Sequence, residues 1–212
     1  MNLAIVGNGE MAHELYSLIM TCDEKNKYES VFFVDLYENK DNKVVSEDDF
    51  LKLDAKSSKV LIALGEPFMR KKMYEKYKVC GFELATFIHP SAVVLNNTII
   101  EEGCIISPFS YLAQNVKIGK NVVLHSGSKI ENDCVIGDNC FINCNAFVGA
   151  KTVIEDNCFL GPGSSLRDSI VIGQSSIIGM GSVVVKSVEA KSVCYGNPAV
   201  YVRENTANKV FK

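Results

Sequence analysis

Three histidines are the side chains of this sequence best suited to proton transfer near neutral pH, because the ordinary pKa of histidine is about 6.5. His13 follows a glycine-rich turn and His89 lies where the sequence pattern changes, and we expect surface or core roles for both. His125 stands in a slot of a repeated pattern where glycine is common. It is therefore the candidate for a general base or proton relay, with a structural role as the alternative.

The glycine-rich turn, residues 7–12 (GNGEMA), directly follows the apolar run Leu3–Val6 and leads into a helical pattern that continues to Met20. Glycines at such a turn let the backbone approach a phosphate at the N-terminus of a helix. Asp35 ends the next apolar run, and its carboxylate can accept hydrogen bonds from a ribose or a base. The pattern predicts a nucleotide site; a tight turn in a structural domain and a nicotinamide-dependent enzyme are the alternatives.

The sequence holds eight cysteines, which we expect to be reduced in a cytosolic chain. Cys140 and Cys144 are four residues apart, but no second pair and no histidine close in sequence completes a set of zinc ligands. The three scattered histidines also argue against the zinc site of a β-helix carbonic anhydrase. We therefore predict no metal.

A repeat of six residues dominates the second half of the chain and predicts its fold. An aliphatic residue occurs at every sixth position from Val94 to Val184, and a small residue usually follows four positions later. This period fits neither an α-helix nor a single strand, but it fits the hexapeptide repeat of a left-handed parallel β-helix. Three faces of six residues make one coil, so a column of isoleucines should stack (Ile118, Ile136, Ile154 and Ile172), and four cysteines, here called the corner cysteines, should fill tight corners (Cys104, Cys134, Cys140 and Cys158).

The residues before the repeat have a different pattern. Apolar runs at Leu3–Val6, Val31–Val34 and Val60–Leu64 alternate with helical segments, including residues 66–78. This order predicts half of a Rossmann-like α/β fold, a size suited to a mononucleotide. We divide the chain into a nucleotide-binding α/β domain (1–88), a left-handed β-helix domain (89–190) and a C-terminal tail (191–212).

The composition argues against other classes of partner. The formal net charge is −3 and no basic stripe is present, so we expect no nucleic acid. No apolar run approaches the length of a membrane-spanning helix, so we expect no membrane contact. The first residues are typical of a buried strand rather than a signal peptide, which predicts a cytoplasmic protein.

A small α/β domain followed by a left-handed β-helix resembles the PglD/NeuD-type sugar acyltransferases. The resemblance covers nearly the whole chain and includes the glycine turn, the hexapeptide repeat, the segment Ile130–Cys134 and the G-x-P-A stretch Gly196–Ala199. Members of this family are bacterial trimers that move acetyl from acetyl-coenzyme A to an amine or hydroxyl of a sugar. The resemblance implies a homotrimer, a nucleotide-linked sugar as substrate and acetyl-coenzyme A as co-substrate, without a metal.

The resemblance also implies site residues. The sugar nucleotide is expected at Gly7, Asn8, Gly9, Glu10, Met11, Asp35, Leu36, Gly65 and Glu66. Coenzyme A is expected at Gly149, Ala150, Gly161, Gly179, Lys186, Gly196 and Pro198, with a backbone N–H near Gly149 or Ala150 as the oxyanion donor. The catalytic residues are expected to be His125, Asn132 and Asp133.

Asn132 stands where the family usually has its catalytic histidine. An asparagine cannot accept a proton at neutral pH, although it can orient an amine or a water. His125 matches a position where the family often has asparagine, so the two residues look exchanged, and the groove between subunits of a trimer would bring them together. Asp133 is a second candidate base, and a sugar amine that arrives neutral would need no protein base.

The sequence therefore predicts an acetyl-coenzyme A-dependent N-acetyltransferase that acts on a UDP- or dTDP-linked 4-amino-4,6-dideoxy sugar in surface polysaccharide synthesis. An alcohol depends more on a general base than an amine does, so Asn132 favours the amine as acceptor. The alternatives are an O-acetyltransferase of the sialic-acid type and a catalytically inactive β-helix protein that binds a sugar nucleotide.

Overall fold

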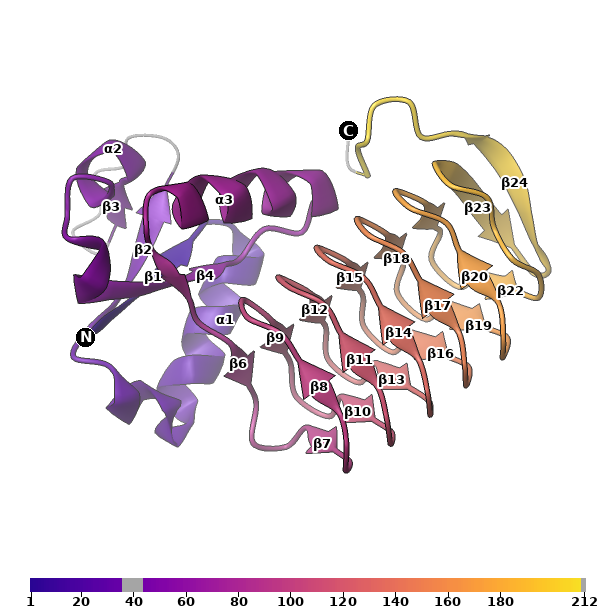
Figure 1. Cartoon of the computed structure of the whole chain (residues 1–212), viewed down its shortest axis with the longest axis horizontal. Coiled ribbons are helices and arrows are strands. Elements are labelled where there is room, and N and C mark those ends of the chain that lie inside the picture. Colours follow the sequence, from indigo (N-terminus) through magenta and orange to yellow (C-terminus); the bar gives the residue numbers. More distant parts are fainter. Residues whose placement is uncertain (36–43, 211–212) are drawn as a thin grey trace.

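The computed structural model describes residues 1–35 and 44–210, so that Leu36, one of the predicted nucleotide contacts, lies outside the described residues. An α/β unit precedes a long stack of short strands; a hairpin lies at the far end of the stack, and the segment after it turns back towards the α/β unit (Figure 1). Within the described residues, no helix has both the length and the apolar character that a membrane crossing needs.

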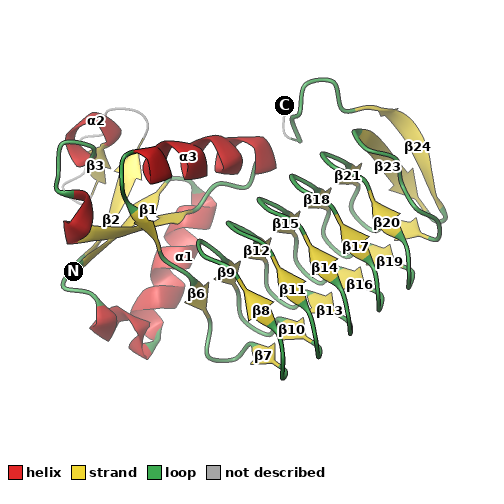
Figure 2. Ribbon diagram, viewed as in Figure 1, coloured by secondary structure: helices red, strands yellow, loops and turns green. Residues whose placement is uncertain are grey.

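The N-terminal unit is a parallel sheet between helices (Figure 2). Its strands are β1 (Asn2–Val6), β2 (Val31–Asp35), β3 (Val44–Ser46), β4 (Ser58–Ile62) and β5 (Glu83–Leu84), in the spatial order β3-β2-β1-β4-β5. Its helices are α1 (Glu10–Thr21), α2 (Glu47–Phe50) and α3 (Pro67–Val79), with 3₁₀ turns at Asp23–Lys27 and Ala55–Ser57. Side chains alternate along β1: Leu3 and Ile5 pack with α1, whereas Ala4 and Val6 pack with α2 and α3. The predicted Rossmann-like fold is confirmed.

The rest of the chain is the predicted left-handed β-helix, with three parallel sheets that we call faces 1, 2 and 3. Face 1 contains β6 (Phe87–Ile88), β9 (Ile105–Ile106), β12 (Val123–Leu124), β15 (Phe141–Ile142), β18 (Phe159–Leu160) and β21 (Ile177–Ile178), extended by β23 (Ser192–Gly196) and the antiparallel β24 (Ala199–Glu204). Face 2 contains β7 (Val93–Val94), β10 (Tyr111–Leu112), β13 (Lys129–Ile130), β16 (Phe147–Val148), β19 (Ser165–Leu166) and β22 (Val183–Val184). Face 3 contains β8 (Ile99–Ile100), β11 (Lys117–Ile118), β14 (Val135–Ile136), β17 (Val153–Ile154) and β20 (Val171–Ile172).

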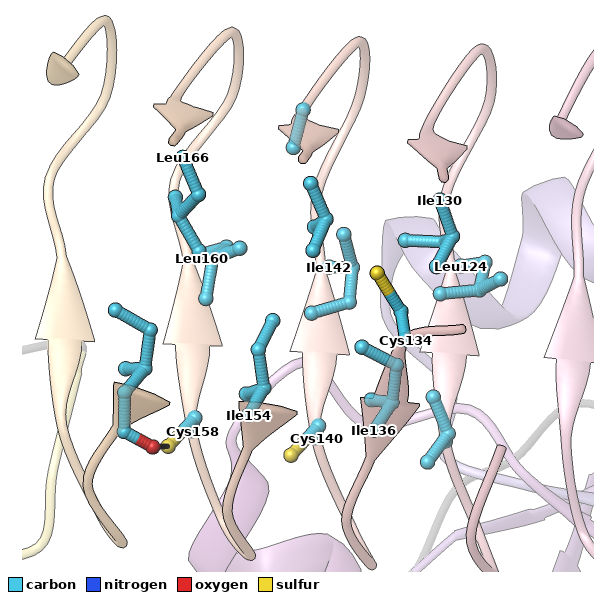
Figure 3. Close-up of a cluster of buried hydrophobic side chains, with 14 of the residues drawn as sticks. Leu124, Ile130, Cys134, Ile136, Cys140, Ile142, Ile154, Cys158, Leu160 and Leu166 are labelled. Carbon is cyan, nitrogen blue, oxygen red and sulfur yellow. Dashed lines mark hydrogen bonds between the residues drawn. The ribbon is translucent and has the colours of Figure 1, made fainter. Parts of the chain in front are cut away.

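The predicted register is confirmed. Ile118, Ile136, Ile154 and Ile172 pair in sequence from one coil to the next, and all four are buried. The four corner cysteines are fully buried among the inward aliphatic side chains, and three of them are seen in Figure 3. Their thiols donate to backbone carbonyls one coil away, so they fill the corners and need no other role.

We call the turns after faces 1, 2 and 3 the first, second and third corners. Every sixth residue from Asn97 to Gly181 has a positive φ, between 55° and 77°, which places one left-handed residue in each corner. Asparagine and glycine adopt this conformation at low cost, and they occupy most of these positions. Asparagine at a period of six is therefore a second signature of this fold, which the sequence interpretation missed.

Face 1 is the surface on which the N-terminal domain packs. Its outward side chains form an apolar column at a spacing of one coil, and all of them are buried (Phe87, Ile105, Val123, Phe141, Phe159 and Ile177). The column belongs to one hydrophobic cluster with Leu15 and Ile19 of α1 and with Leu3 of β1. On the other faces the outward positions include exposed lysines such as Lys117 and Lys129. Burial of this column fixes the α/β domain against the coils.

Candidate active site

The first group of predicted nucleotide residues lies at the carboxyl edge of the parallel sheet, where open α/β sheets bind ligands. Gly7 has φ 117°, and an added Cβ would lie 3.0 Å from the carbonyl oxygen of Ala63, so this turn requires glycine. Asn8 Nδ2 donates to Asp35 Oδ2 at 3.3 Å. Asn8 Oδ1 is buried and has no hydrogen-bond partner among the described residues, which is rare and marks a place for a donor from a ligand or water.

The other residues of this turn differ in their surroundings. Gly9 is the N-cap of α1, and none of residues 1–35 and 44–210 lies within 4 Å of the Cβ that a side chain would place there. Glu10 is exposed in the first turn of α1. Met11 lies towards the β-helix, where it lines a small hollow together with Glu14 and His125. The start of α1 therefore faces both the sheet edge and the first corner of the β-helix.

Glu66 lies at the N-cap of α3 and is linked to the end of the chain. Both of its carboxylate oxygens accept the backbone N–H of Val210, at 2.9 and 3.0 Å. The C-terminal segment thus folds back over face 1 and borders an open hollow of about 160 Å³, whose lining includes Lys71, Asn157 and Lys191. The sequence interpretation did not detect this contact, because the two residues are 144 positions apart.

Arg70 fixes the loop that contains Gly65 and Glu66. The side chain is fully buried, and its guanidinium donates to the backbone oxygens of Ile62 and Leu64 and to Asn121 in the third corner. Burial lowers the pKa of Arg70 to about 9, so the group stays charged at neutral pH. One cation therefore joins the end of β4, α3 and the β-helix.

His125 begins the first corner after β12, faces α1 and is 17% exposed. The backbone N–H of Ser126 donates to His125 Nδ1 at 2.9 Å. An N–H can only donate, so Nδ1 carries no proton and the neutral ring has its hydrogen on Nε2. That nitrogen lies 3.6 Å from Glu14 Oε2 of α1.

Cys144 lies 3.1 Å from the same Nδ1 atom, sulfur to nitrogen. This histidine is close to the cysteine in space although it is distant in sequence. The two residues are 19 positions apart in sequence, which is one coil plus one residue. The length of the coil could therefore have predicted that they lie close together on neighbouring coils. Cys144 and Glu14 are the functional candidates that the sequence interpretation missed.

The two other histidines have local roles. The His13 ring packs against Phe33 with ring centres 4.7 Å apart. His89 Nδ1 accepts the backbone N–H of Ser91 at 3.1 Å and thereby closes the turn before β7. Both fit the surface or core roles that the sequence suggested.

Asn132 and Asp133 lie in the second corner, both exposed, and each supports the neighbouring coil. Asn132 Oδ1 accepts the backbone N–H of Gln114 at 3.1 Å, as Asp168 Oδ1 does for Ala150 at 3.0 Å. Asp133 has φ 59° and accepts from Asn115 Nδ2 at 2.9 Å. Within one chain, His125 and Asn132 thus follow different faces.

The predicted coenzyme A residues lie in these same two corners and in the turn between β23 and β24. Gly149, Ala150 and Lys186 lie in the second corner. The N–H of Gly149 donates to Leu166 O and that of Ala150 to Asp168 Oδ1, so neither is available as the oxyanion donor that the sequence suggested. Gly161 and Gly179 lie in the first corner, in the column of His125, and Gly196 and Pro198 form the turn between β23 and β24.

The comparisons match these two units, the parallel α/β sheet and the hexapeptide β-helix, to known domain families. Residues 2–77 match the PglD N-terminal domain, and residues 115–150 and 151–186 match the family described as bacterial transferase hexapeptide (six repeats). The chain thus contains a region that matches a PglD N-terminal domain, followed by regions that match hexapeptide repeats, and the resemblance to the PglD type is confirmed.

Several relatives share parts or all of this architecture. GDP-perosamine N-acetyltransferase of Escherichia coli O157:H7 is 34% identical over 77 residues, which is 36% of this chain and about a third (35%) of that protein. PerB from Caulobacter crescentus, in complex with CoA and GDP-perosamine, has a TM-score of 0.87 at 24% identity, over 96% of this chain and 98% of PerB. WeeI from Acinetobacter baumannii AYE has a TM-score of 0.78 at 26% identity, over 95% and 100% of the two chains. The acetyltransferase domain of PglB from Neisseria gonorrhoeae FA1090 has a TM-score of 0.85 at 22% identity, over 95% and 99%.

Proposed function

We propose that this protein transfers acetyl from acetyl-coenzyme A to the amine of a nucleotide-linked sugar. The single observation that carries the proposal is the joint match of a PglD N-terminal domain and hexapeptide repeats in one chain. The E. coli relative, named as a GDP-perosamine N-acetyltransferase, supports an amino sugar as acceptor. PerB shares the fold along nearly its whole length and is described with CoA and GDP-perosamine, which supports the same pair of substrates.

The nucleotide end of the substrate binds at the carboxyl edge of the sheet in this proposal. Among the described residues, the buried Asn8 Oδ1 has no hydrogen-bond donor there, and the Asp35 carboxylate lies beside the same amide. A ribose hydroxyl or the exocyclic amine of a base supplies the donor that Asn8 Oδ1 needs. The sequence suggested UDP or dTDP as the nucleotide, and the perosamine relatives add GDP as a third candidate.

The proposed assembly is a homotrimer in the cytoplasm, with the acetyl donor held along the coils and by the Gly196–Ala199 turn. Acetyl-coenzyme A is the co-substrate. The proposed domain limits of 88 and 190 stay as the sequence predicts them.

The test is release of the coenzyme A thiol from acetyl-coenzyme A in the presence of 4-amino-4,6-dideoxy sugars linked to UDP, dTDP or GDP. We expect turnover with one nucleotide, and we expect Asn8→Ala to raise KM for the sugar nucleotide while KM for acetyl-coenzyme A is unchanged. Asn26→Ala, at an exposed position of the first 3₁₀ turn, is the matched control. Absence of turnover with all three, while a sugar nucleotide still binds, would favour a catalytically inactive binding protein.

A further inference from the structure

We propose that the hollow between α3, the third corner of the β-helix and the C-terminal segment, here called the third-corner hollow, is a second binding site, which takes a phosphate-type anion. It lies at the opposite edge of face 1 from the first corner. Among the described residues that line it, the nucleotide candidates Gly7, Asn8 and Asp35 do not occur. The inference goes beyond the proposed function, because such binding requires neither acetyl-coenzyme A nor a sugar nucleotide.

A ladder of asparagine side chains leads along the third corner to this hollow. The Arg70 guanidinium donates to Asn121 Oδ1 at 2.7 Å. Asn121 Nδ2 donates to Asn139 Oδ1 at 2.8 Å, and Asn139 Nδ2 donates in turn to Asn157 Oδ1 at 3.4 Å. The first two asparagines are buried, whereas Asn157 is half-buried and lines the hollow. The ladder therefore begins at a buried cation and ends at the hollow.

The arginine fixes the direction of every hydrogen bond in this ladder. A guanidinium can only donate, so the oxygen of the first amide faces it and the nitrogen faces the next coil. The same orientation repeats at each step, which leaves the NH₂ group of Asn157 at the end. Among residues 1–35 and 44–210, no acceptor is found for Asn157 Nδ2. The aligned amides strengthen one another, and their positive end lies at the hollow.

Two lysines add positive charge to the lining of the hollow. Lys71 lies in the first half of α3, and Lys191 directly precedes β23. Lys71 Nζ is 3.9 Å from Glu75 Oε1, a surface pair that contributes little. An ammonium group is a common ligand of phosphate. An anion in the hollow therefore meets two ammonium groups and one amide NH₂ group.

Three carboxylates lie near the hollow, and backbone N–H groups already engage them. Glu66 accepts from Val210 through both oxygens, at 2.9 and 3.0 Å. Glu155 Oε2 accepts the N–H of Gln174 at 2.8 Å, and Asp156 Oδ1 accepts a backbone N–H one coil away at 2.9 Å. These hydrogen bonds offset part of the negative charge, so the groups that remain for a ligand favour an anion.

The C-terminal segment forms one wall of the hollow and is fixed at two points. Asn205 is buried, donates through Nδ2 to Ser175 O at 2.9 Å and accepts the N–H of Lys209 at 3.1 Å. Val210 is held by Glu66, so the end of the chain lies beside α3 (Figure 1). A cavity of about 150 Å³ holds a benzene-sized molecule, and this hollow measures about 160 Å³. It therefore has room for a tetrahedral oxyanion, and its open side has room for a group attached to that ion.

The test is equilibrium dialysis of the full-length protein against inorganic phosphate and, separately, against a hexose 1-phosphate. We expect one saturable site per chain, with affinity that falls as salt is added. Tighter binding of the hexose 1-phosphate would assign the site to a phosphorylated sugar, and tighter binding of inorganic phosphate would assign it to the free ion.

The decisive variant is Asn157→Asp. It keeps the oxygen that accepts from Asn139 but replaces the free NH₂ group by a carboxylate oxygen, so we expect at least about 10-fold weaker binding. Lys191→Gln is a second variant, at an exposed side chain, and should also weaken binding. Asn96→Asp is the matched control, because it makes the same change of charge at an exposed position of the second corner and should bind phosphate normally.

Three results would overturn the inference. The first is the absence of saturable binding of both anions to the native protein. The second is native affinity in both Asn157→Asp and Lys191→Gln, which would place the ion elsewhere. The third is displacement of phosphate by the sugar nucleotide or by acetyl-coenzyme A, which would make the hollow part of the substrate site. Failure of acetyl transfer would refute the proposed function and leave this binding test unaffected.

Discussion

The buried Arg70 provides the sharpest test of how the two domains are joined. Replacement by methionine, Arg70→Met, keeps an unbranched apolar stem but removes every donor of the guanidinium. Three backbone oxygens, those of Ile62, Leu64 and Asn121, then lose their hydrogen-bond donor in the interior. The Asn121 side-chain oxygen loses it as well.

The expected magnitude follows from these contacts. A buried acceptor without a partner costs about 1–3 kcal/mol, so four acceptors cost roughly 4–12 kcal/mol. Removal of a buried charge offsets part of this cost, since burial already lowers the pKa of Arg70 to about 9. We expect Arg70→Met to reduce the free energy of unfolding by about 3–5 kcal/mol, the lower part of that sum, because the offset reduces it.

The assay is urea unfolding followed by circular dichroism, with Arg167→Met as the matched control because Arg167 is exposed. The control should change the unfolding free energy by less than about 0.5 kcal/mol. A loss below about 1 kcal/mol in Arg70→Met would refute the reasoning, because water would then have replaced the guanidinium at these oxygens.

Three further predictions concern the coils. Gly161→Ala places a Cβ 2.5 Å from the backbone nitrogen of Met180, and we expect it to lower the free energy of unfolding in urea by about 1–3 kcal/mol. Gly163→Asn, at φ 64° in open space, should lower it by less than about 1 kcal/mol. Equal losses in the two variants would contradict this prediction. Asn132→Asp keeps the acceptor for Gln114 N–H and should leave stability unchanged, while Asn132→Ala should lose roughly 0.5–1 kcal/mol of unfolding free energy. The corner cysteines should resist a thiol reagent at pH 8 until the protein unfolds, since burial raises the pKa of Cys104 to about 12 and that of Cys134 to about 11; the exposed Cys80 should react at once, and rapid labelling of a corner cysteine would show that the coils open.

The fold was predictable because every hexapeptide repeats the same pattern of residue types, and each repeat forms the same short strand and corner. The inward aliphatic residues, the small corner residues and the column from Ile118 to Ile172 all follow from one period, and the structure has them as predicted. The apolar outward column of face 1 was also visible in the sequence, at one coil per step from Phe87 to Ile177. It was missed because only the inward phase of the repeat was considered.

The candidate site was less predictable, since its contacts join segments that share no pattern. Glu14 reaches His125 from α1, and Val210 reaches Glu66 from the end of the chain. Neither pairing follows from period or composition, because both depend on how the α/β domain packs on face 1. The contact of Cys144 with His125 could have been predicted from the sequence. Cys144 directly follows the residue that lies one coil after His125.

The apolar column on face 1 also limits how the gene for such a chain can change in length. Loss of one hexapeptide would keep every inward aliphatic residue in phase, yet it would move each later strand to the next face. Outward lysines of the kind at 117 and 129 would then meet the α/β domain, while the phenylalanines would turn to solvent. Insertions and deletions inside the β-helix are therefore tolerated only as whole coils. The β-helix can change in length one coil at a time while the α/β domain stays packed on face 1.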